Sequence, residues 1–288
     1  MKTCKLCGAN GDFRAWQGAE KFFGTGEVFI YFECPKCETL QIDEFPKDMS
    51  SHYPSSYYSY NKPPITHAPS GTTPKTPHVL DVGCGGGAYL CNLASQGFVN
   101  LAGCDPFIDR DYVYENGVEI KKCSIHEMDG EYDMIHLSHV FEHMPDPDDV
   151  FRTFDRLLRR QNINGITPYI EIHIPVYPNI AFDKFGVDWY QLDAPRHFFI
   201  HSVKSMAALA DKHGFKIYDT TYNSTNYLQF TVSLCYQMGI PFVDYHKSME
   251  TDERCQAIKA SIPMYQDLVR QAAQKGYSDE ARFQIVRK

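Results

Sequence analysis

The sequence predicts an α/β fold, a doubly wound sheet with helices on both faces, preceded by a small cysteine-rich domain. Three observations carry this prediction. From His78 onward, short apolar runs alternate with amphipathic segments, as in chains that connect parallel strands through helices. Residues 79–89, VLDVGCGGGAY, have the pattern of a strand, a glycine turn and a helix. Two Cys-x-x-Cys pairs stand near the N-terminus.

The N-terminal pairs predict a zinc-ribbon-like domain over residues 1–45. The four thiols belong to Cys4, Cys7, Cys34 and Cys37, and residues 27–33 between the pairs read as a strand. Four thiolates close a tetrahedral zinc site without an open position, so we expect a structural Zn²⁺. The alternative is a set of unrelated buried cysteines.

Residues 46–77 hold seven prolines and are expected to be a linker rather than a packed unit. Four tyrosines gather in it: Tyr53, Tyr57, Tyr58 and Tyr60. Their rings would either contact a sugar or nucleoside or pack the connection between the domains.

The remaining chain divides into a main domain over 78–240 and a helical C-terminal extension over 241–288. Strands are expected at 79–82, 100–105, 118–123, 132–137, 169–175, 215–221 and 227–236, and helices at 88–96, 148–160, 202–213 and 251–275. Ser202 would cap the third of these helices, and Gly214 would end it.

Composition narrows the class of protein. The formal charge is −8, and the acidic residues are scattered, which argues against a nucleic-acid-binding surface. The first residues lack the apolar core of a signal peptide, and no segment holds the roughly 18 apolar residues that span a bilayer. Ten cysteines without a secretion signal suggest reduced thiols and metal ligands. We therefore expect a cytoplasmic protein without membrane insertion.

The glycine turn is compatible with two kinds of nucleotide ligand. The spacing of Gly83, Gly85 and Ala88 satisfies the nicotinamide fingerprint, which is weak evidence alone. Asp81 stands two residues before the first glycine, where a carboxylate would repel a pyrophosphate but suit a cationic amino-acid group. Asp105, after the second strand, could bind the hydroxyls of an unphosphorylated ribose. Asp81 and Asp105 together favour a ligand that carries a cationic amino-acid group and an unphosphorylated ribose.

Together with SHVFEHMPDP at 138–147, this pattern resembles the Rossmann-like S-adenosylmethionine-dependent methyltransferases over about residues 78–220. The resemblance implies a seven-stranded sheet and S-adenosylmethionine as cofactor. It places Gly83, Cys84, Gly85 and Gly87 at the methionine part, Asp81 at its amino group, Asp105 at the ribose, Pro106, Ser124 and Ile125 at the adenine, and Ser138 and His139 near the methyl group.

Glu142 and His143 follow the fourth strand and are candidate catalytic residues. In some related methyltransferases an acidic–histidine motif at this point binds a divalent ion, which would imply metal-assisted O-methylation. The alternative is that the pair only shapes this loop.

The segment 189–202, WYQLDAPRHFFIHS, resembles methyltransferases of polysaccharide and nucleotide-sugar gene clusters. In the sugar C-methyltransferases of that group, which also carry a four-cysteine zinc domain, a Glu–His pair stands at a similar point and its histidine acts as base. Here Arg196 replaces the glutamate and His197 matches the histidine. Arg196 would hold a phosphate or pair with Asp193, and His197 would be either the base or a core histidine.

The sequence therefore predicts methyl transfer to the oxygen or carbon of a small-molecule acceptor, a sugar, nucleotide-sugar or glycan precursor. An RNA, protein or small aromatic acceptor and a non-catalytic S-adenosylmethionine-binding protein are the alternatives. A nicotinamide-dependent oxidoreductase is the least favoured.

Overall fold

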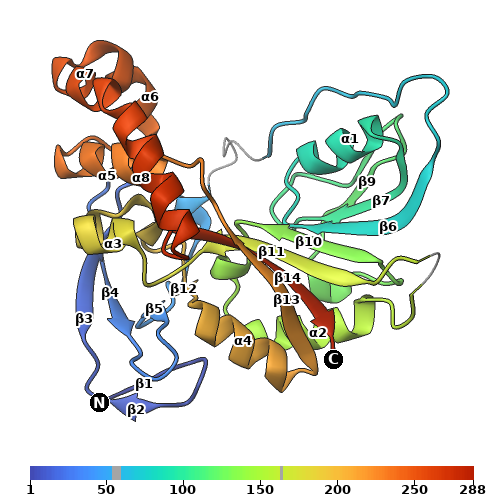
Figure 1. Ribbon diagram of the computed structural model, residues 1–288, viewed down its shortest axis with the longest axis horizontal. Coiled ribbons are helices and arrows are strands. Elements are labelled where there is room, and N and C mark those ends of the chain that lie inside the picture. Colours follow the sequence, from blue (N-terminus) through green and yellow to red (C-terminus); the bar gives the residue numbers. More distant parts are fainter. Residues whose placement is uncertain (54–59, 163–164) are drawn as a thin grey trace.

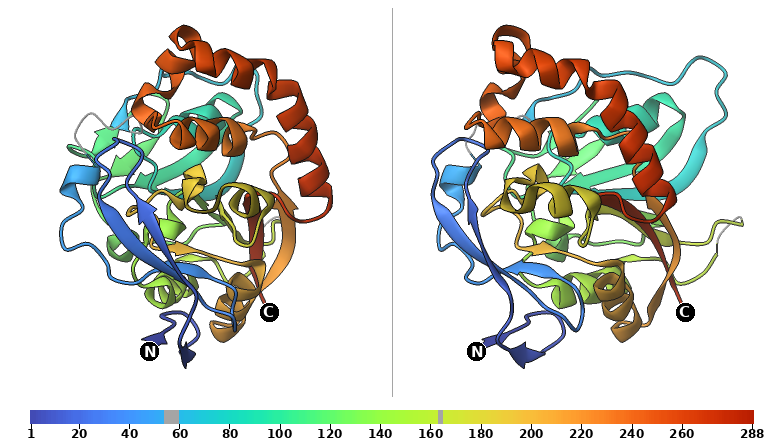
Figure 2. Two further views of the ribbon diagram at one scale, coloured as in Figure 1. Left: turned by 90° about the vertical axis from the view of Figure 1, so that its left-hand side faces the viewer. Right: turned by 60° about the vertical axis from the view of Figure 1, so that its left-hand side comes forward.

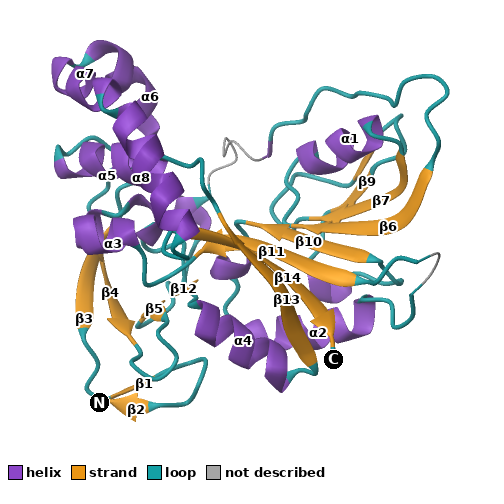
Figure 3. Ribbon diagram, in the orientation of Figure 1, coloured by secondary structure: helices purple, strands orange, loops and turns teal. Residues whose placement is uncertain are grey.

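The computed structural model describes residues 1–53, 60–162 and 165–288 and contains a large central sheet and a smaller N-terminal sheet (Figures 1 and 3). Tyr57 and Tyr58 of the predicted linker lie outside the described residues. The N-terminal sheet lies near the carboxyl ends of the parallel strands of the central sheet.

The central sheet has the order β13-β14-β11-β10-β6-β7-β9-β8. Its strands are β6 (Lys75–Val82), β7 (Phe98–Cys104), β8 (Tyr112–Val113), β9 (Glu119–Lys121), β10 (Met134–Ser138), β11 (Tyr169–Pro175), β13 (Phe215–Tyr222) and β14 (Glu280–Arg287). The five neighbouring strands β11, β10, β6, β7 and β9 are parallel to one another, and β14 is antiparallel to both of its neighbours, β11 and β13. Seven strands form the expected sheet, and the two-residue β8 adds an edge.

Helices cover both faces of this sheet, as predicted. Helix α1 (Ala88–Ser95) lies on one face, and α2 (Pro147–Leu157) and α4 (Val203–Lys212) lie on the other (Figure 1). Phe151 and Phe154 of α2 belong to the main apolar core together with Ile135, Ile170 and Ile172 of the sheet. The core therefore fixes the strands whose ends carry the site described below.

The predicted strand at 227–236 was wrong, because this segment forms helix α5 (Leu228–Gln237). Phe230, Val232 and Cys235 are fully buried, and so are most of the residues around them. A segment buried on nearly every side shows neither the period of a strand nor that of a helix. Its β-branched and aromatic residues suggested a strand, but its packing made a helix.

The last strand of the sheet is β14, so the prediction of a purely helical extension over 241–288 was wrong at its end. Helices α5, α6 (Phe242–Thr251), α7 (Glu253–Ala260) and α8 (Ile262–Gln274) form an insertion between β13 and β14. Within β14, Ala281, Phe283 and Ile285 point into the core and alternate with more exposed residues. The helical insertion gathers beside the N-terminal strands (Figure 2).

The N-terminal domain shares its sheet with the main domain. The sheet order is β12-β5-β4-β3, formed by β3 (Ala15–Ala19), β4 (Val28–Glu33), β5 (Leu40–Ile42) and β12 (Phe199–Ile200); β1 (Lys2–Thr3) and β2 (Asn10–Gly11) form a separate hairpin. The Tyr31 hydroxyl donates to the His197 carbonyl at 2.8 Å, and the Ser202 hydroxyl donates to the Cys37 carbonyl at 2.6 Å. The segment 195–202 is thus held in place by the N-terminal sheet.

No helix among the described residues is long and apolar enough to cross a membrane.

Phe283→Ala tests the assignment of β14 to the core. Phe283 is fully buried between β11 and β13. Its truncation should lower the free energy of unfolding by about 3–5 kcal/mol, measured by urea denaturation. The control is Tyr218→Ala on β13, whose side chain is 73% exposed and whose loss should change stability by less than about 0.5 kcal/mol. Equal effects of both variants would contradict the placement of β14.

Candidate functional site

The predicted cofactor residues come together at the carboxyl ends of the parallel strands. The glycine turn follows β6, Asp105 follows β7, Ser124 and Ile125 follow β9, and Ser138 ends β10. Backbone hydrogen bonds hold this edge in register: Gly83 N donates to Cys104 O at 2.7 Å, and His139 N donates to His173 O at 2.9 Å. Ligands of open α/β sheets bind at this edge, so the arrangement fits a cofactor site.

Two glycines of the turn are required by close contacts. A Cβ atom on Gly83, whose φ is +66°, would lie 2.5 Å from a methyl group of Val140. A Cβ atom on Gly86 would lie 2.1 Å from the carbonyl oxygen of Asn61. The segment that contains Asn61 therefore passes directly over the turn, a contact that the sequence did not predict.

The two acidic residues of the predicted cofactor site are buried and have protein partners. Asp105 accepts hydrogen bonds from Gly85 N at 3.0 Å and Phe107 N at 2.8 Å. Asp81 lies 2.7 Å from Nδ1 of His136, whose ring stacks on Tyr89. Burial raises the pKa of both carboxyl groups. Each carboxylate oxygen has a second lone pair, so these contacts are compatible with a ligand.

The residues predicted to lie near the adenine differ in burial and polarity. Ile125 is buried in the core, whereas Ser124 caps the 3₁₀ helix Ile125–Glu127, and its backbone N–H and hydroxyl donate to Glu127. Pro106 lies between Asp105 and the exposed ring of Phe107, which stacks against Tyr53. Tyr53 comes from the predicted linker, which therefore reaches this side of the site.

Glu142 is a fully buried carboxylate among histidines. Its Oε1 lies 3.5 Å from His139 Nδ1 and 3.7 Å from His197 Nε2. Although burial favours the protonated acid, the imidazoles of His139, His143 and His197 lower the pKa of Glu142 to about 2. Burial also disfavours a charge on His139, but Glu142 and Glu280 raise the pKa of that imidazole to about 9. Without a bound metal ion, Glu142 and His139 thus form a charged pair at neutral pH.

Arg196 and His197 are both buried. The Arg196 guanidinium donates to Asp193 at 2.6 Å and lies 3.7 Å from the centre of the Phe22 ring. Of the two roles predicted for Arg196, the structure therefore shows the pairing with Asp193. His197 Nδ1 lies 2.8 Å from the Gln191 carbonyl, and its Nε2 faces Glu142 and Asp193. Both ring nitrogens of His197 face protein groups.

His143 lies beside this pair. Its Nδ1 is 2.7 Å from the Arg196 carbonyl and 3.1 Å from the Tyr53 hydroxyl. His143 therefore connects the segment before β12 to the predicted linker.

A second histidine–carboxylate group, which the sequence analysis missed, lies next to His139. Glu280, the first residue of β14, is buried, and its carboxylate lies 3.5 Å from His173 Nε2 and 3.9 Å from His139 Nε2. The amides of Asn223, Asn226 and Gln191 donate to it at 2.7, 2.6 and 2.5 Å. Glu171 and His173 interrupt the apolar strand β11 at alternate positions, a signal that could have revealed His173. No motif near Glu280 in the sequence identifies it as a candidate site residue.

The four N-terminal cysteines lie together as predicted, with their Sγ atoms all within 4.8 Å of one another. Cys4 Sγ is 3.6 Å from Cys37 Sγ, and Cys7 Sγ is 3.5 Å from Cys34 Sγ. Hydrogen bonds from the Cys37 thiol and the Gln41 amide, against the effect of burial, lower the pKa of Cys4 to about 4.

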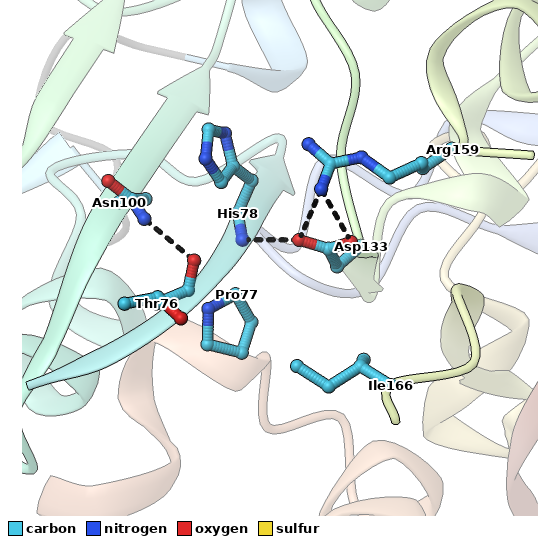
Figure 4. Close-up of a pocket in the computed structure, with 7 residues that line it drawn as sticks. All are labelled: Thr76, Pro77, His78, Asn100, Asp133, Arg159 and Ile166. Atoms are coloured by element: carbon cyan, nitrogen blue, oxygen red, sulfur yellow. Dashed lines mark hydrogen bonds and ion pairs between the residues drawn. The ribbon is translucent and has the colours of Figure 1, made fainter. Parts of the chain in front are cut away.

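A separate pocket of about 220 Å³ lies at the opposite, amino end of β6 and β7 (Figure 4). Asp133 lines this pocket. Its carboxylate forms an ion pair with Arg159 at 3.1 Å and accepts a hydrogen bond from His78 N at 2.8 Å. Asp133 thus links His78 of β6 to Arg159, and the pocket is remote from the glycine turn at the other end of β6.

Comparisons with known proteins point to one family. A family model described as a methyltransferase domain matches residues 56–220. A ubiquinone biosynthesis O-methyltransferase of Pseudomonas aeruginosa is 35% identical over 92 residues, which cover 28% of this chain and 39% of that protein.

Similar solved structures are more distant. A cyclopropane synthase of Mycobacterium tuberculosis has 13% identity and a TM-score of 0.45, covering 75% of this chain and 79% of that one. A geranyl diphosphate C-methyltransferase of Streptomyces coelicolor has 11% identity and a TM-score of 0.44, covering 76% and 72%.

Buried neutral histidines should make the fold sensitive to acid. Burial lowers the pKa of His197 to about 4 and that of His201 to about 3. The unfolded chain takes up these protons near pH 6.5, whereas the folded chain does not. The free energy of unfolding should therefore fall as the pH drops from about 6.5 to 4.

His201→Gln should reduce this pH dependence by about one proton per molecule, measured by urea denaturation across that range. The control His67→Gln removes a histidine that is 59% exposed and should leave the slope unchanged. An unaltered slope in His201→Gln would show that His201 is protonated in the folded protein.

Proposed function

The chain belongs to the class I S-adenosylmethionine-dependent methyltransferases, and we propose that its acceptor is a hydroxyl group of a sugar or nucleotide-sugar. The family match supplies the reaction: S-adenosylmethionine, when bound, supplies a methyl group on a positively charged sulfur. The protein must bind this donor, orient the acceptor and, where needed, remove a proton from the acceptor.

We assign the donor to the carboxyl edge of the sheet. The glycines of the turn carry no Cβ atom, so the donor could approach the backbone closely there, and Asp105 directly after β7 would bind the ribose hydroxyls. Asp81 lies beneath the turn, where a carboxylate suits the amino group of the methionine part. This placement puts the sulfur towards Ser138 and His139 at the end of β10.

The acceptor assignment rests on the side chains at that end. Glu142, Glu280 and Asp193 bring negative charge to it, and the imidazoles of His139 and His173 are its partly exposed groups. Arg196 is already paired with Asp193, so it provides no clear clamp for a phosphate. Imidazoles and carboxylates suit the neutral, hydroxyl-bearing sugar part of such an acceptor better than an anionic group, so the phosphates of a nucleotide-sugar would lie away from this end.

A small aromatic hydroxyl compound is the second candidate. The relative from Pseudomonas aeruginosa is an O-methyltransferase of ubiquinone biosynthesis, but this chain matches less than half of its length. The stacked rings of Tyr53 and Phe107, 5.5 Å apart, would offer an apolar contact to such an acceptor.

A screen of acceptors tests the proposal. The protein is incubated with S-adenosylmethionine and nucleotide-sugars, free sugars or hydroxylated aromatic compounds, and mass spectrometry detects the added methyl group. We expect a sugar-containing acceptor to be methylated, and Asp105→Ala to abolish the product by weakening donor binding. Methylation of aromatic acceptors alone would contradict the sugar assignment.

We further propose that the four N-terminal cysteines hold a structural Zn²⁺. Tetrahedral sites with Zn–S distances of about 2.3 Å place their sulfurs about 3.8 Å apart. The observed separations of 3.6 and 3.5 Å are close to this value. The ion would hold β5 against β12 and thereby fix the segment that carries His197.

Cys34→Ser should remove the zinc and destabilise the N-terminal sheet. Elemental analysis of the purified wild-type chain should find about one zinc ion, which the variant loses. Cys235→Ser is the matched control, because Cys235 is a buried cysteine of α5 outside the cluster. Zinc retained at full stoichiometry in Cys34→Ser would refute the assignment.

A further inference from the structure

Three side chains from distant parts of the chain converge next to the predicted methyl position. His139 follows β10, His173 lies on β11, and Glu280 begins β14. One nitrogen of each imidazole and one carboxylate oxygen lie within 4.8 Å of one another. The converging atoms are His139 Nε2, 3.9 Å from Glu280 Oε1, and His173 Nε2, 3.5 Å from Glu280 Oε2.

Neighbouring groups orient two of these three side chains. The other nitrogen of His139, Nδ1, faces the buried Glu142 carboxylate at 3.5 Å. Three amide groups hold the Glu280 carboxylate, of which only Asn223 donates to Oε2. Carboxylates behind a ligating imidazole and hydrogen bonds to a ligating carboxylate are common around protein-bound metals.

The group is open on one side. The side chains of His139 and His173 are 38% and 28% exposed, whereas Glu280 is buried. Three protein ligands would therefore leave coordination positions for water or a substrate oxygen. Glu142, His143 and His197 also lie within 4.8 Å of one another, but Glu142 and His197 are buried and Glu142 is already paired with His139. Glu142 thus supports His139 from behind.

We propose that His139, His173 and Glu280 bind a divalent first-row transition-metal ion. Two imidazole nitrogens and one carboxylate oxygen suit Mn²⁺, Fe²⁺, Co²⁺ or Zn²⁺ better than Ca²⁺ or Mg²⁺, which prefer oxygen ligands alone. Coordination would require Nε2 of both imidazoles to be free of a proton, so binding should strengthen as the pH rises.

The role of this ion rests on the proposed function. An acceptor hydroxyl that coordinates the ion would lose its proton to solvent more readily, because the metal stabilises the alkoxide. The oxygen then forms a bond to the methyl carbon, and the electron pair of the broken carbon–sulfur bond remains on the sulfur. Binding of the ion itself requires neither donor nor acceptor.

Titration of the whole 288-residue chain with Mn²⁺, followed by electron paramagnetic resonance of the free ion, tests this site. Mn²⁺ is the probe because four thiolates prefer softer ions, so the N-terminal cysteines should not bind it. We expect about one Mn²⁺ per chain, and His173→Ala and Glu280→Gln should each weaken binding at least about tenfold.

The matched control is Arg282→Lys. Arg282 is an exposed residue of β14, two positions after Glu280, and the substitution preserves the positive charge. Arg282 pairs with Glu171 at 3.6 Å and should not affect Mn²⁺ binding. If His173→Ala does not fold by circular dichroism, His173→Gln replaces it. Absence of Mn²⁺ binding by the wild-type chain, or equal binding by the ligand variants, would overturn the proposal. A failed acceptor screen would leave this result unaffected.

Discussion

The arrangement of the site depends on the buried carboxylate of Glu142. An ionised group without contact to water requires positive or hydrogen-bonding partners, and here the charged imidazole of His139, 3.5 Å away, is the positive partner. His139 comes from the end of β10 and His197 from the segment before β12, so one carboxylate fixes two parts of the chain. The Glu142 carbonyl also accepts a hydrogen bond from Phe198 N at 2.9 Å. The donor edge and the segment before β12 are therefore joined at one residue.

The N-terminal domain contributes to the same arrangement. Because β12 pairs with β5, the small sheet and the main domain share a strand. Tyr31 holds the His197 carbonyl, and Phe198 packs against Phe45 with ring centres 4.8 Å apart. The four-cysteine cluster lies at the N-terminal end of β5, and a bound zinc ion would stabilise this sheet. We infer that the N-terminal domain shapes the acceptor side of the site.

The residues assigned to the donor are easier to recognise in the sequence than those assigned to the acceptor. The glycine turn, Asp105 and the residues after β10 are local signals, since each stands at the end of an apolar strand. Asn61 over Gly86 and Glu280 beside His139 depend on contacts between distant segments, which one sequence does not reveal. The same limit explains the errors at the C-terminal end of the fold. α5 is buried on nearly all sides and lacks a period, and β14 follows a helical insertion that separates it from β13.

We infer that methyl transfer takes place at the carboxyl ends of β10 and β11, beside His139 and His173. A crystal structure of the protein with S-adenosylhomocysteine tests it most directly. We expect the ribose to contact Asp105 and the sulfur to face the two imidazoles without protein atoms between them. A sulfur directed away from both histidines, or a ligand bound elsewhere, would contradict it.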